Sequence, residues 1–325
     1  MSQTDKTTVL QPKKKKSKLT LDDIQLFLLS LPTTIWFIMF CYVPMFGILI
    51  AFKKYKVAPG KGFLWSLVYN SKWCGLDNFK FLFKSNAKTT IAMFRNTVGY
   101  NIVFIVLGIV IPVALAIIIS HLYSKKLAKF CQTLIFLPHF LSWVIVGYFV
   151  YAFLSTDKGL INSILVSLGG ERIMWYQDKK PWPYLLTFIN TWKTFGYSMV
   201  VYMATITGID NSLYESAVID GASKWQQCKG ITIPLLRPVI SIMFIMNVGS
   251  IFSTDFGLFF QVTRDSNSII DVTQTLDVYV HKALMQNNNY NYSSAVSLLQ
   301  NTLGCILLLI ANRVVKFIDP ESGLF

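Results

Sequence analysis

The stretch "YESAVIDGASKWQQCKGITIP", Tyr214 to Pro234, is charged and broken by glycine, and long apolar segments lie on both sides of it. At its start, Ser212 and Glu215 have the Ser-x-x-Glu spacing of a capping box, in which each side chain bonds a backbone N–H that the first turn of a helix leaves free. This spacing predicts a helix that begins near Leu213.

The same stretch contains a helix break. Glycine adopts the positive φ that closes a helix at low cost, so Asp220-Gly221 is expected to end the first helix. A second short helix is expected from Ala222 to Cys228, and Ile233-Pro234 then begins the return to an apolar segment. The small residues of the loop would form one face that fits a groove on a partner: Ser216, Ala217, Gly221 and Ala222.

The composition of the chain is that of a membrane protein. Charged residues make up 14% of its 325 positions, whereas soluble domains carry about 25%. A helix needs about 20 apolar residues to cross the hydrocarbon core of a bilayer. Transmembrane spans are predicted at about 26–52, 96–120, 131–154, 184–208, 236–261 and 295–318. The predicted fold class is an all-α polytopic membrane protein with six transmembrane helices.

The polar segments divide the chain into a tail and one membrane domain. Residues 1–25 are predicted as a basic tail that includes Lys13 to Lys16, and residues 26–325 as a transmembrane domain with a polar loop at 209–235. The first apolar segment is long and bulky throughout, so it is interpreted as an uncleaved span rather than as a signal peptide. With six spans, both termini lie on the same side of the membrane as loop 209–235.

Charge counting alone does not decide which side this is. Cytoplasmic loops usually carry an excess of Lys and Arg, but here these residues are almost balanced between the two sides. The Lys13 to Lys16 run beside the first span favours a cytoplasmic N-terminus, because the first span usually dominates orientation. The net charge of +14 lies mostly in short segments beside apolar runs, which fits binding to lipid headgroups better than to nucleic acid.

The sequence lacks the patterns that catalysis or metal binding requires. No Gly-x-x-x-x-Gly-Lys-Ser/Thr loop is present to hold nucleotide phosphates. His121, His139 and His281 are dispersed, and no two cysteines have the Cys-x-x-Cys spacing of a zinc or redox site. The chain is therefore predicted to have no catalytic residues, no metal and no cofactor of its own.

The loop sequence "ESAVIDGASKWQQCKGITIP" resembles the Glu-Ala-Ala…Gly…Ile-x-Leu-Pro loop in the permease subunits of binding-protein-dependent ABC importers. The matching residues are Glu215, Ala217, Gly221, Ile231 and Pro234. The chain departs from the pattern at Ser216, where the family has a second alanine, and at Ile233, where it has leucine. Serine is small enough to keep the same fit.

Three further segments resemble the carbohydrate class of this family, and with the loop they cover most of the chain. They are "FLPHFLSWVIVGYFVYAFLSTDKGLIN", "WKTFGYSMVVYMATITGID" and "DVYVHKALMQNNNYNYSSAVSLLQN". These segments are similar to the maltose importer permeases, and most similar to the branch that imports oligosaccharides and polysaccharide fragments. The resemblance implies an ATP-driven oligosaccharide importer in the bacterial cytoplasmic membrane, with this chain as one permease.

The resemblance also implies partners: a homologous second permease, two cytoplasmic ATPase subunits that bind ATP and Mg, and an external solute-binding protein that delivers the sugar. In that family the loop is the coupling helix, which sits in a cleft of the ATPase with its glutamate toward a basic residue there. By position, the coupling residues are Glu215, Ser216, Ala217, Asp220, Gly221 and Ala222. Closure of the ATPase dimer would move this helix and open the spans alternately to each side.

Polar residues inside the predicted spans are candidates for the sugar path, because such groups mark transport routes in membrane proteins. Asn247, Ser250 and Thr254 recur at i, i+3 and i+7 of the fifth span, which predicts one polar stripe along a helix. Lys193 and Tyr197 lie one turn apart in the fourth span. These positions resemble the sugar-contacting ones in the maltose importer permease.

Other roles remain open for these residues. Asn, Ser and Thr commonly hydrogen-bond between spans, so the stripe is also interpreted as contacts between helices. If Lys193 and Arg95 both line the path, their charges favour an acidic sugar such as a uronate oligomer.

Alternatives remain open for the role of the loop and for the function of the chain. Loop 209–235 has the composition of an amphipathic connector on lipid headgroups, in which Glu215 only completes its own helix cap. A stand-alone secondary transporter of a polar solute is the main alternative function, although no repeat is visible in the sequence. A membrane-embedded enzyme is the third.

Overall fold

The computed structural model describes residues 20–80 and 87–325, so residues 1–19 of the predicted tail lie outside the described part. The chain divides into two compact units, Met1–Ile48 and Leu49–Phe325. Nearly all regular structure is helical. Within the described ranges, the strands are the antiparallel pair β1 (Lys53–Lys54) and β2 (Lys72–Trp73).

The first unit is built from one helical segment. Helix α1 (Leu21–Phe37) begins with a capping box, in which Thr20 Oγ1 accepts the backbone N–H of Asp23 and the Asp23 carboxylate accepts the N–H of Thr20. The π-helix η1 (Ile38–Tyr42) and the short α2 (Val43–Met45) follow. No side chain of α1 is buried, so this apolar helix needs lipid or another protein around it.

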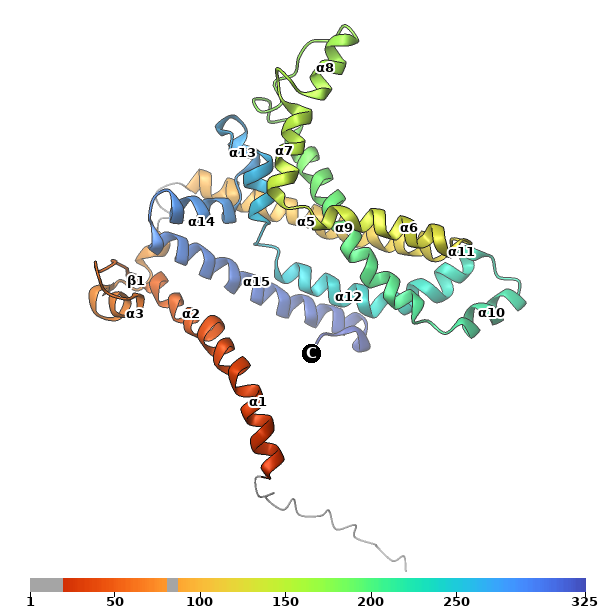
Figure 1. Ribbon diagram of the computed structural model, residues 1–325, viewed down its shortest axis with the longest axis horizontal. Coiled ribbons are helices and arrows are strands. Elements are labelled where there is room, and N and C mark those ends of the chain that lie inside the picture. Colours follow the sequence, from red (N-terminus) through yellow and green to blue (C-terminus); the bar gives the residue numbers. More distant parts are fainter. Residues whose placement is uncertain (1–19, 81–86) are drawn as a thin grey trace, which may run out of the picture. The chain divides into compact units, whose positions relative to one another are not determined.

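The second unit contains the remaining helices, which Figure 1 labels where there is room. Its elements up to the centre of the chain are η2 (Phe46–Phe52, which begins in the first unit), α3 (Phe63–Trp65), η3 (Ser66–Asn70), η4 (Asp77–Phe79), α5 (Ala87–Ser120), α6 (Lys125–Phe136), η5 (Leu137–Phe140), α7 (Trp143–Leu154), α8 (Leu160–Ser167) and α9 (Trp182–Thr207). The rest are α10 (Asn211–Ile219), α11 (Lys224–Gln227), η6 (Cys228–Thr232), α12 (Ile233–Gly249), η7 (Leu258–Val262), η8 (Asn267–Ile269), α13 (Ile270–Thr273), α14 (Leu276–Met285), α15 (Tyr290–Ile318) and η9 (Pro320–Ser322).

Several of these helices are long and apolar enough to cross a membrane. In the described part of the chain four pass this test: Leu21–Phe52, Thr89–Ser120, Lys224–Gly249 and Tyr290–Ile318. A fifth is obtained if the pair Lys125–Phe140 and Trp143–Leu154, bent by 96°, counts as one span. The predicted fourth span coincides with α9, which is not among these candidates.

Two predicted spans are broken. The third, predicted as one helix over 131–154, bends sharply at Leu141-Ser142, because Pro138 lacks an N–H for the helical ladder and the Ser142 hydroxyl caps a new helix at Ile145 N. The fifth, predicted over 236–261, ends as α12 at Gly249, and the chain is helical again only from about Phe256.

Helix α9 lies at the centre of the second unit and packs against α5, α6, η5, α12, α13 and η7. Trp182 and Leu186 lie in one hydrophobic core with Phe259, and Met199 and Tyr202 lie in another with Leu236. This packing explains how a helix that carries Asn190 and Lys193 is accommodated, since its neighbours shield much of it from lipid. Helices α12 and α15 run side by side (Figure 1).

Candidate functional site

Helix α10 begins earlier in loop 209–235 than the sequence predicts. Its N-cap is Asp210, whose Oδ1 accepts the backbone N–H of Ser212 at 3.0 Å, and its first residue is Asn211. The predicted capping box of Ser212 and Glu215 is therefore wrong. Aspartate is as good an N-cap as serine, and Asp210 meets the free N–H groups first. Its bonds from the backbone and side chain of Ser212 hold the pKa of Asp210 below its usual value.

With Asp210 as the N-cap of α10, the Glu215 carboxylate is available for another contact. Its side chain is exposed and has no hydrogen-bond or ion-pair partner among the described residues. The cap of α10 is already formed by Asp210, so Glu215 is not needed for that cap. An unpartnered carboxylate on a short exposed helix is available to a second protein.

The predicted break at Asp220-Gly221 is confirmed. Gly221 has φ +77°, and the backbone N–H groups of Gly221 and Ala222 bond back to Val218 O and Ala217 O at 3.0 and 2.8 Å. This is the closed helix end that a residue in the left-handed region provides.

The second predicted helix differs in both of its ends. Helix α11 starts at Lys224 with a capping box formed by Ser223 and Gln226. It does not stop at Cys228 but continues through the π-helix η6 into α12. Pro234 has no N–H to donate to the ladder, and the π turn just before it accommodates this loss without ending the helix.

The loop is braced against its own return helix. The Tyr214 hydroxyl lies 2.9 Å from Thr232 Oγ1, and Gln227 Nε2 donates to Ala222 O at 2.9 Å. Tyr214 is on α10 and Thr232 is in η6, so a force applied to α10 is passed to the base of α12. This is the mechanical property that a coupling element needs.

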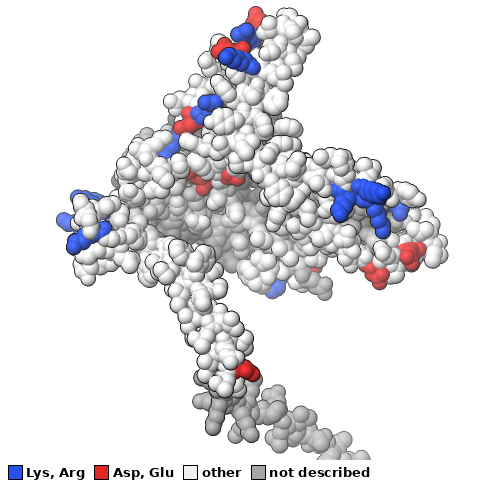
Figure 2. Space-filling model, viewed as in Figure 1, with Lys and Arg blue, Asp and Glu red and all other residues white. Residues whose placement is uncertain are grey.

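The exposed face of the loop is more apolar than predicted. Of the predicted small face, Ser216 and Gly221 are exposed, whereas Ala217 and Ala222 are half-buried. Large apolar side chains lie exposed beside them, with exposed fractions of 85% for Ile219 and 71% for Trp225. An exposed apolar patch beside charged groups is typical of a protein interaction site. Figure 2 shows acidic atoms on α10 and basic atoms over the neighbouring ends of α6 and α11.

A second candidate site lies where the two broken spans meet α9. Lys193 Nζ donates to His139 O in η5 at 3.1 Å and lies 4.9 Å from the centre of the Trp143 ring. Trp143 Nε1 donates to Asp255 Oδ2 at 2.5 Å, and Asp255 also accepts the backbone N–H of Gly257. Lys193 therefore ties α9 to the break in the third span, and Trp143 ties that break to the segment after α12.

The two residues of α9 that the sequence predicts for the path, Lys193 and Tyr197, lie in different surroundings. The ammonium of Lys193 is occupied by a carbonyl and a ring, so its contacts are structural. Tyr197, one turn further on, stacks on His139 with ring centres 4.9 Å apart, and half of the side chain is exposed. Its phenol has no hydrogen-bond partner among the described residues, so Tyr197 remains a candidate for contact with a polar ligand.

The predicted stripe of Asn247, Ser250 and Thr254 on one helical face is wrong. Helix α12 ends at Gly249, where α15 passes so close that a Cβ on Gly304 would lie 2.4 Å from Gly249 O. Thr254 lies beyond the helix and turns toward α14: its backbone N–H and its hydroxyl donate to Asp277 Oδ2 at 2.6 and 3.0 Å. Asn247 and Ser250 are exposed, so these two residues of the predicted stripe are open to a ligand.

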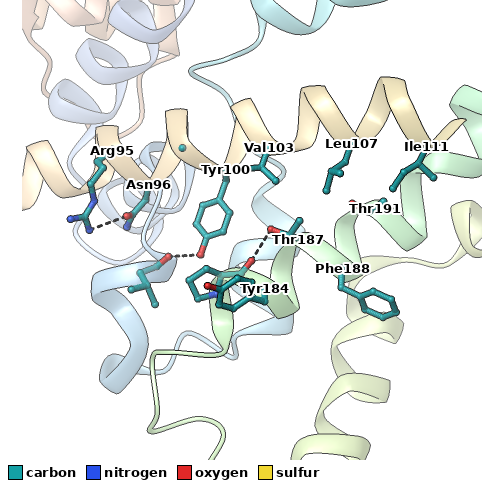
Figure 3. A pocket seen from close by; sticks show the side chains of 13 residues that line it. Arg95, Asn96, Tyr100, Val103, Leu107, Ile111, Tyr184, Thr187, Phe188 and Thr191 are labelled. Carbon is teal, nitrogen blue, oxygen red and sulfur yellow. Dashed lines mark hydrogen bonds between the residues drawn. The ribbon is translucent and has the colours of Figure 1, made fainter. Parts of the chain in front are cut away.

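A groove of about 620 Å³ lies between α5 and α9 (Figure 3). Arg95 and Asn96 lie at one end, and Leu107 and Ile111 lie at the other. Most of its lining is apolar, so it does not suit the many hydroxyl groups of a sugar. Arg95 belongs to this groove and Lys193 does not, so the structure does not bring together the two cations expected to favour an acidic sugar.

The structure also bears on metal binding. Among residues 20–80 and 87–325, no three His, Cys, Asp or Glu side chains lie close enough together to hold a metal ion. The five cysteines, Cys41, Cys74, Cys131, Cys228 and Cys305, are unpaired with one another.

Comparison with known proteins identifies relatives along almost the whole chain. The family of binding-protein-dependent transport system inner membrane components matches residues 108–260, which include the broken spans and loop 209–235. The polygalacturonan/rhamnogalacturonan transport system permease protein of Bacillus subtilis is 34% identical over 97% of this chain and 95% of its own length. The arabinooligosaccharides transport system permease protein of the same organism is 26% identical over 92% of this chain and 88% of its own length.

Solved structures of a bacterial ABC transporter are also similar to this chain. The chain is similar to one in the crystal structure of a bacterial ABC transporter involved in the import of the acidic polysaccharide alginate, with a TM-score of 0.79 and 30% identity over 92% of this chain and 97% of the other. A second structure shows the bacterial alginate ABC transporter in complex with its alginate pentasaccharide-bound periplasmic protein, with the same TM-score and identity.

Proposed function

We infer the function from one established fact: this chain belongs to the family of binding-protein-dependent transport system inner membrane components. We propose that it is one permease subunit of an ATP-driven importer of oligosaccharides. The observation that carries the proposal is loop 209–235, where an unpartnered Glu215 lies among exposed apolar side chains on a braced helix. A secondary transporter working alone would have no use for such a surface.

The partners follow from this proposal. A homologous permease would complete the membrane unit, and two ATPase subunits would bind ATP and Mg and receive α10, with Glu215, Ser216, Ala217, Asp220, Gly221 and Ala222 at the contact. A solute-binding protein would deliver the sugar on the opposite face, which the alginate transporter in complex with its periplasmic protein supports. The test is uptake in proteoliposomes, which should require ATP and the binding protein together.

The substrate class is proposed from the relatives. Their substrates include rhamnogalacturonan and arabinooligosaccharides, which supports an oligosaccharide. Two of the similar proteins handle polyuronates, polygalacturonan and alginate, which supports an acidic one. The identity of the glycan is set largely by the binding protein that presents it.

The proposed topology has six spans, with both termini and loop 209–235 in the cytoplasm of a bacterial cell. In this arrangement α9 is the fourth span, and the bent pair of α6–η5 and α7 is the third. Residues 26–325 then form one permease domain.

This topology predicts opposite labelling of two exposed positions. In a chain whose native cysteines are replaced, Lys229→Cys should react with a membrane-impermeant thiol reagent only in inside-out vesicles. Ser268→Cys should react only in right-side-out cells. Both positions are exposed, so burial does not limit the reaction, whereas native Cys228 is only 5% exposed and would be a poor reporter. Labelling of Lys229→Cys in intact cells would contradict the topology.

The exposed amide of Asn247 is proposed to contact the sugar. Its Nδ2 donates to Met243 O of its own helix, and its carbonyl oxygen has no hydrogen-bond partner in the part of the chain that the structure describes. Asn247→Leu should lower uptake by about tenfold, the effect of losing a hydrogen bond to a bound substrate, and should leave assembly unchanged. Asn301→Leu is the matched control, because Asn301 is also exposed and donates to Ser297 O in the same way.

Thr254 is expected to behave differently. Thr254→Val removes the hydroxyl that bonds Asp277 and Thr275, so it should lower the unfolding temperature of the complex while leaving uptake per assembled complex near normal. If Asn247→Leu also changed stability without changing uptake, both residues would be packing residues rather than parts of the path.

A further inference from the structure

A cavity of about 250 Å³ lies between α7 and the chain around η7. Gly147 and Tyr148 of α7 line one side of it, and Gln261, Arg264 and Asp265 line the other. The two elements are in close contact here, since a Cβ on Gly147 would lie 2.8 Å from Gln261 O. In the proposed topology, this cavity faces the side from which the sugar arrives.

Arg264 is the unpaired cation of this cavity. Its guanidinium carbon lies 4.0 Å from the centre of the Tyr151 ring, and its N–H groups have no hydrogen-bond or carboxylate partner among the described residues. The neighbouring carboxylate of Asp265 does not neutralise it, because Asp265 forms an ion pair with the largely buried Lys282. The guanidinium is held in place by the ring and keeps its hydrogen-bond donors free.

The backbone that positions Arg264 is strained. Arg264 and Asp265 have φ values of 53° and 51°, in the left-handed region that residues with side chains seldom occupy. Surrounding contacts hold the turn: Ser266 Oγ donates to Tyr176 O at 2.9 Å, and Ser266 N donates to Thr263 O. Strain of this kind persists where the rest of the structure enforces it, and it is concentrated at functional sites.

The two exposed sides of α7 differ in character. Ile145, Phe149 and Phe153 form an apolar side that suits lipid. Tyr148 and Tyr151 bring phenol groups to the other side, next to Arg264. The Tyr148 hydroxyl and the Gln261 amide have no hydrogen-bond partner among the described residues. A free cation, a phenol and an amide that converge in this way indicate a water-filled path rather than a lipid face.

We propose that this cavity is a subsite for the carboxylate of an acidic sugar, which rests on the proposed function as an oligosaccharide permease. Arg264 binds the carboxylate through two parallel N–H···O bonds, the geometry for which a guanidinium is suited. The Tyr148 ring packs against the C–H face of the sugar, and the Gln261 amide bonds a hydroxyl group. The subsite would select uronates over neutral sugars after their release from the binding protein.

The test compares two substrates that differ at the carboxyl group, whose negative charge methyl esterification removes. Short oligogalacturonates and their methyl esters are supplied to the assembled transporter with its solute-binding protein in proteoliposomes. Arg264→Gln should lower the uptake rate of the free acid by about tenfold or more, the effect of losing a charge-assisted hydrogen-bond pair. Uptake of the methyl ester should be unchanged. Arg264→Lys keeps the positive charge without the paired N–H geometry. Its uptake rate for the free acid should lie between that of the unchanged chain and that of Arg264→Gln.

Controls separate recognition from folding. Glutamine, like arginine, is a long side chain without a preference for the left-handed region. Arg264→Gln therefore leaves the energetic cost of the positive φ at this position unchanged. Arg172→Gln removes an exposed arginine that pairs with Asp157 away from the cavity, and it should have no effect on either substrate.

Two results would overturn the subsite: an equal loss for both substrates in Arg264→Gln, or no loss for the acid. Uptake of the ester but not of the acid by the unchanged transporter would also overturn it and would leave the permease function standing. A transporter that shows neither ATP-dependent uptake nor hydrolysis stimulated by the binding protein would instead contradict the proposed function itself.

Discussion

Glu215→Ala is expected to reduce both uptake and binding-protein-stimulated ATP hydrolysis. Glu215 has no hydrogen-bond or ion-pair partner among the described residues, and Asp210 forms the cap of α10 in its place. In the proposed complex, α10 would enter a cleft on the ATPase, and the carboxylate would be desolvated against a cation there. Removing one partner of such a pair costs roughly 2–5 kcal/mol, which lowers the affinity about 30-fold or more. The measurements are ATPase activity and uptake in proteoliposomes, with copurification of the ATPase.

Gly221→Val should have the same result for a different reason. Gly221 holds φ +77°, which valine adopts only with strain, although no atom lies within 4 Å of a Cβ at this position. The substitution therefore acts on the backbone and not on packing inside the chain. It should reorient α10 relative to α11 and so displace both Ile219 and Glu215 from the positions in which they would meet the proposed ATPase.

The control for this pair of variants is Glu171→Ala. Glu171 is also an exposed glutamate without a partner among the described residues, and it lies in the segment proposed to face the other side of the membrane. Its removal should leave hydrolysis and uptake unchanged. If both loop variants retained normal coupled activity, loop 209–235 would be a connector on the lipid surface, and the main physical support for the importer would be lost.

The break at Asp220-Gly221 is predictable from sequence because the rule behind it is local. A glycine after a helical stretch gives the backbone a conformation that few other residues accept. The start of α10 is also set locally, but there two caps compete. Asp210 and Ser212 both suit an N-cap, and the spacing of Ser212 to Glu215 hides the earlier candidate.

The broken spans are not predictable from hydrophobicity. The segments 131–154 and 236–261 are mostly apolar. Exposure to lipid and burial in protein both favour such a composition, so hydrophobicity does not distinguish a straight span from a broken one. Pro138 and the Ser142 cap mark the break in 131–154 locally, but both breaks are held by contacts between segments far apart in the sequence: Lys193 with His139 O, Trp143 with Asp255, and Gly249 with Gly304. For this reason a stripe counted along an ideal helix places Thr254 on a face that the chain does not form.

The direction of the Arg264 side chain is a third feature that the sequence alone does not predict. Positive φ is expected at glycine, and the sequence "VTRDSNS" around Arg264 contains none. The left-handed turn is imposed by Ser266, Tyr176 and the ion pair of Asp265 with Lys282, which tertiary structure brings together. A charged side chain whose direction is set by such contacts is visible only in the folded chain.

Gly196→Ala is expected to destabilise the membrane domain strongly, because a Cβ there would lie 2.2 Å from Ile135 O and 2.9 Å from the Cα of Phe136. Both are backbone atoms, so no side-chain rotation relieves the contact and α9 must move away from α6. Overpacking of this kind costs roughly 1–3 kcal/mol and occasionally more. Separation of the helices would also stretch the bond from Lys193 to His139 O, because Lys193 lies about one turn from Gly196 on α9. The measurement is the unfolding temperature of the purified complex.

The matched control is Gly108→Ala on α5, which is also within a long helix but has no atom within 4 Å of the added Cβ. Both substitutions gain the same helix propensity, about 0.5–1 kcal/mol, so the difference between them measures the contact at Gly196 alone. Gly108→Ala should leave the unfolding temperature unchanged or raise it, whereas Gly196→Ala should lower it. Equal unfolding temperatures for the two variants would mean that α9 and α6 are not in contact at the break. Lys193 would then no longer be held by His139 O, and its ammonium would be available to a ligand in the path.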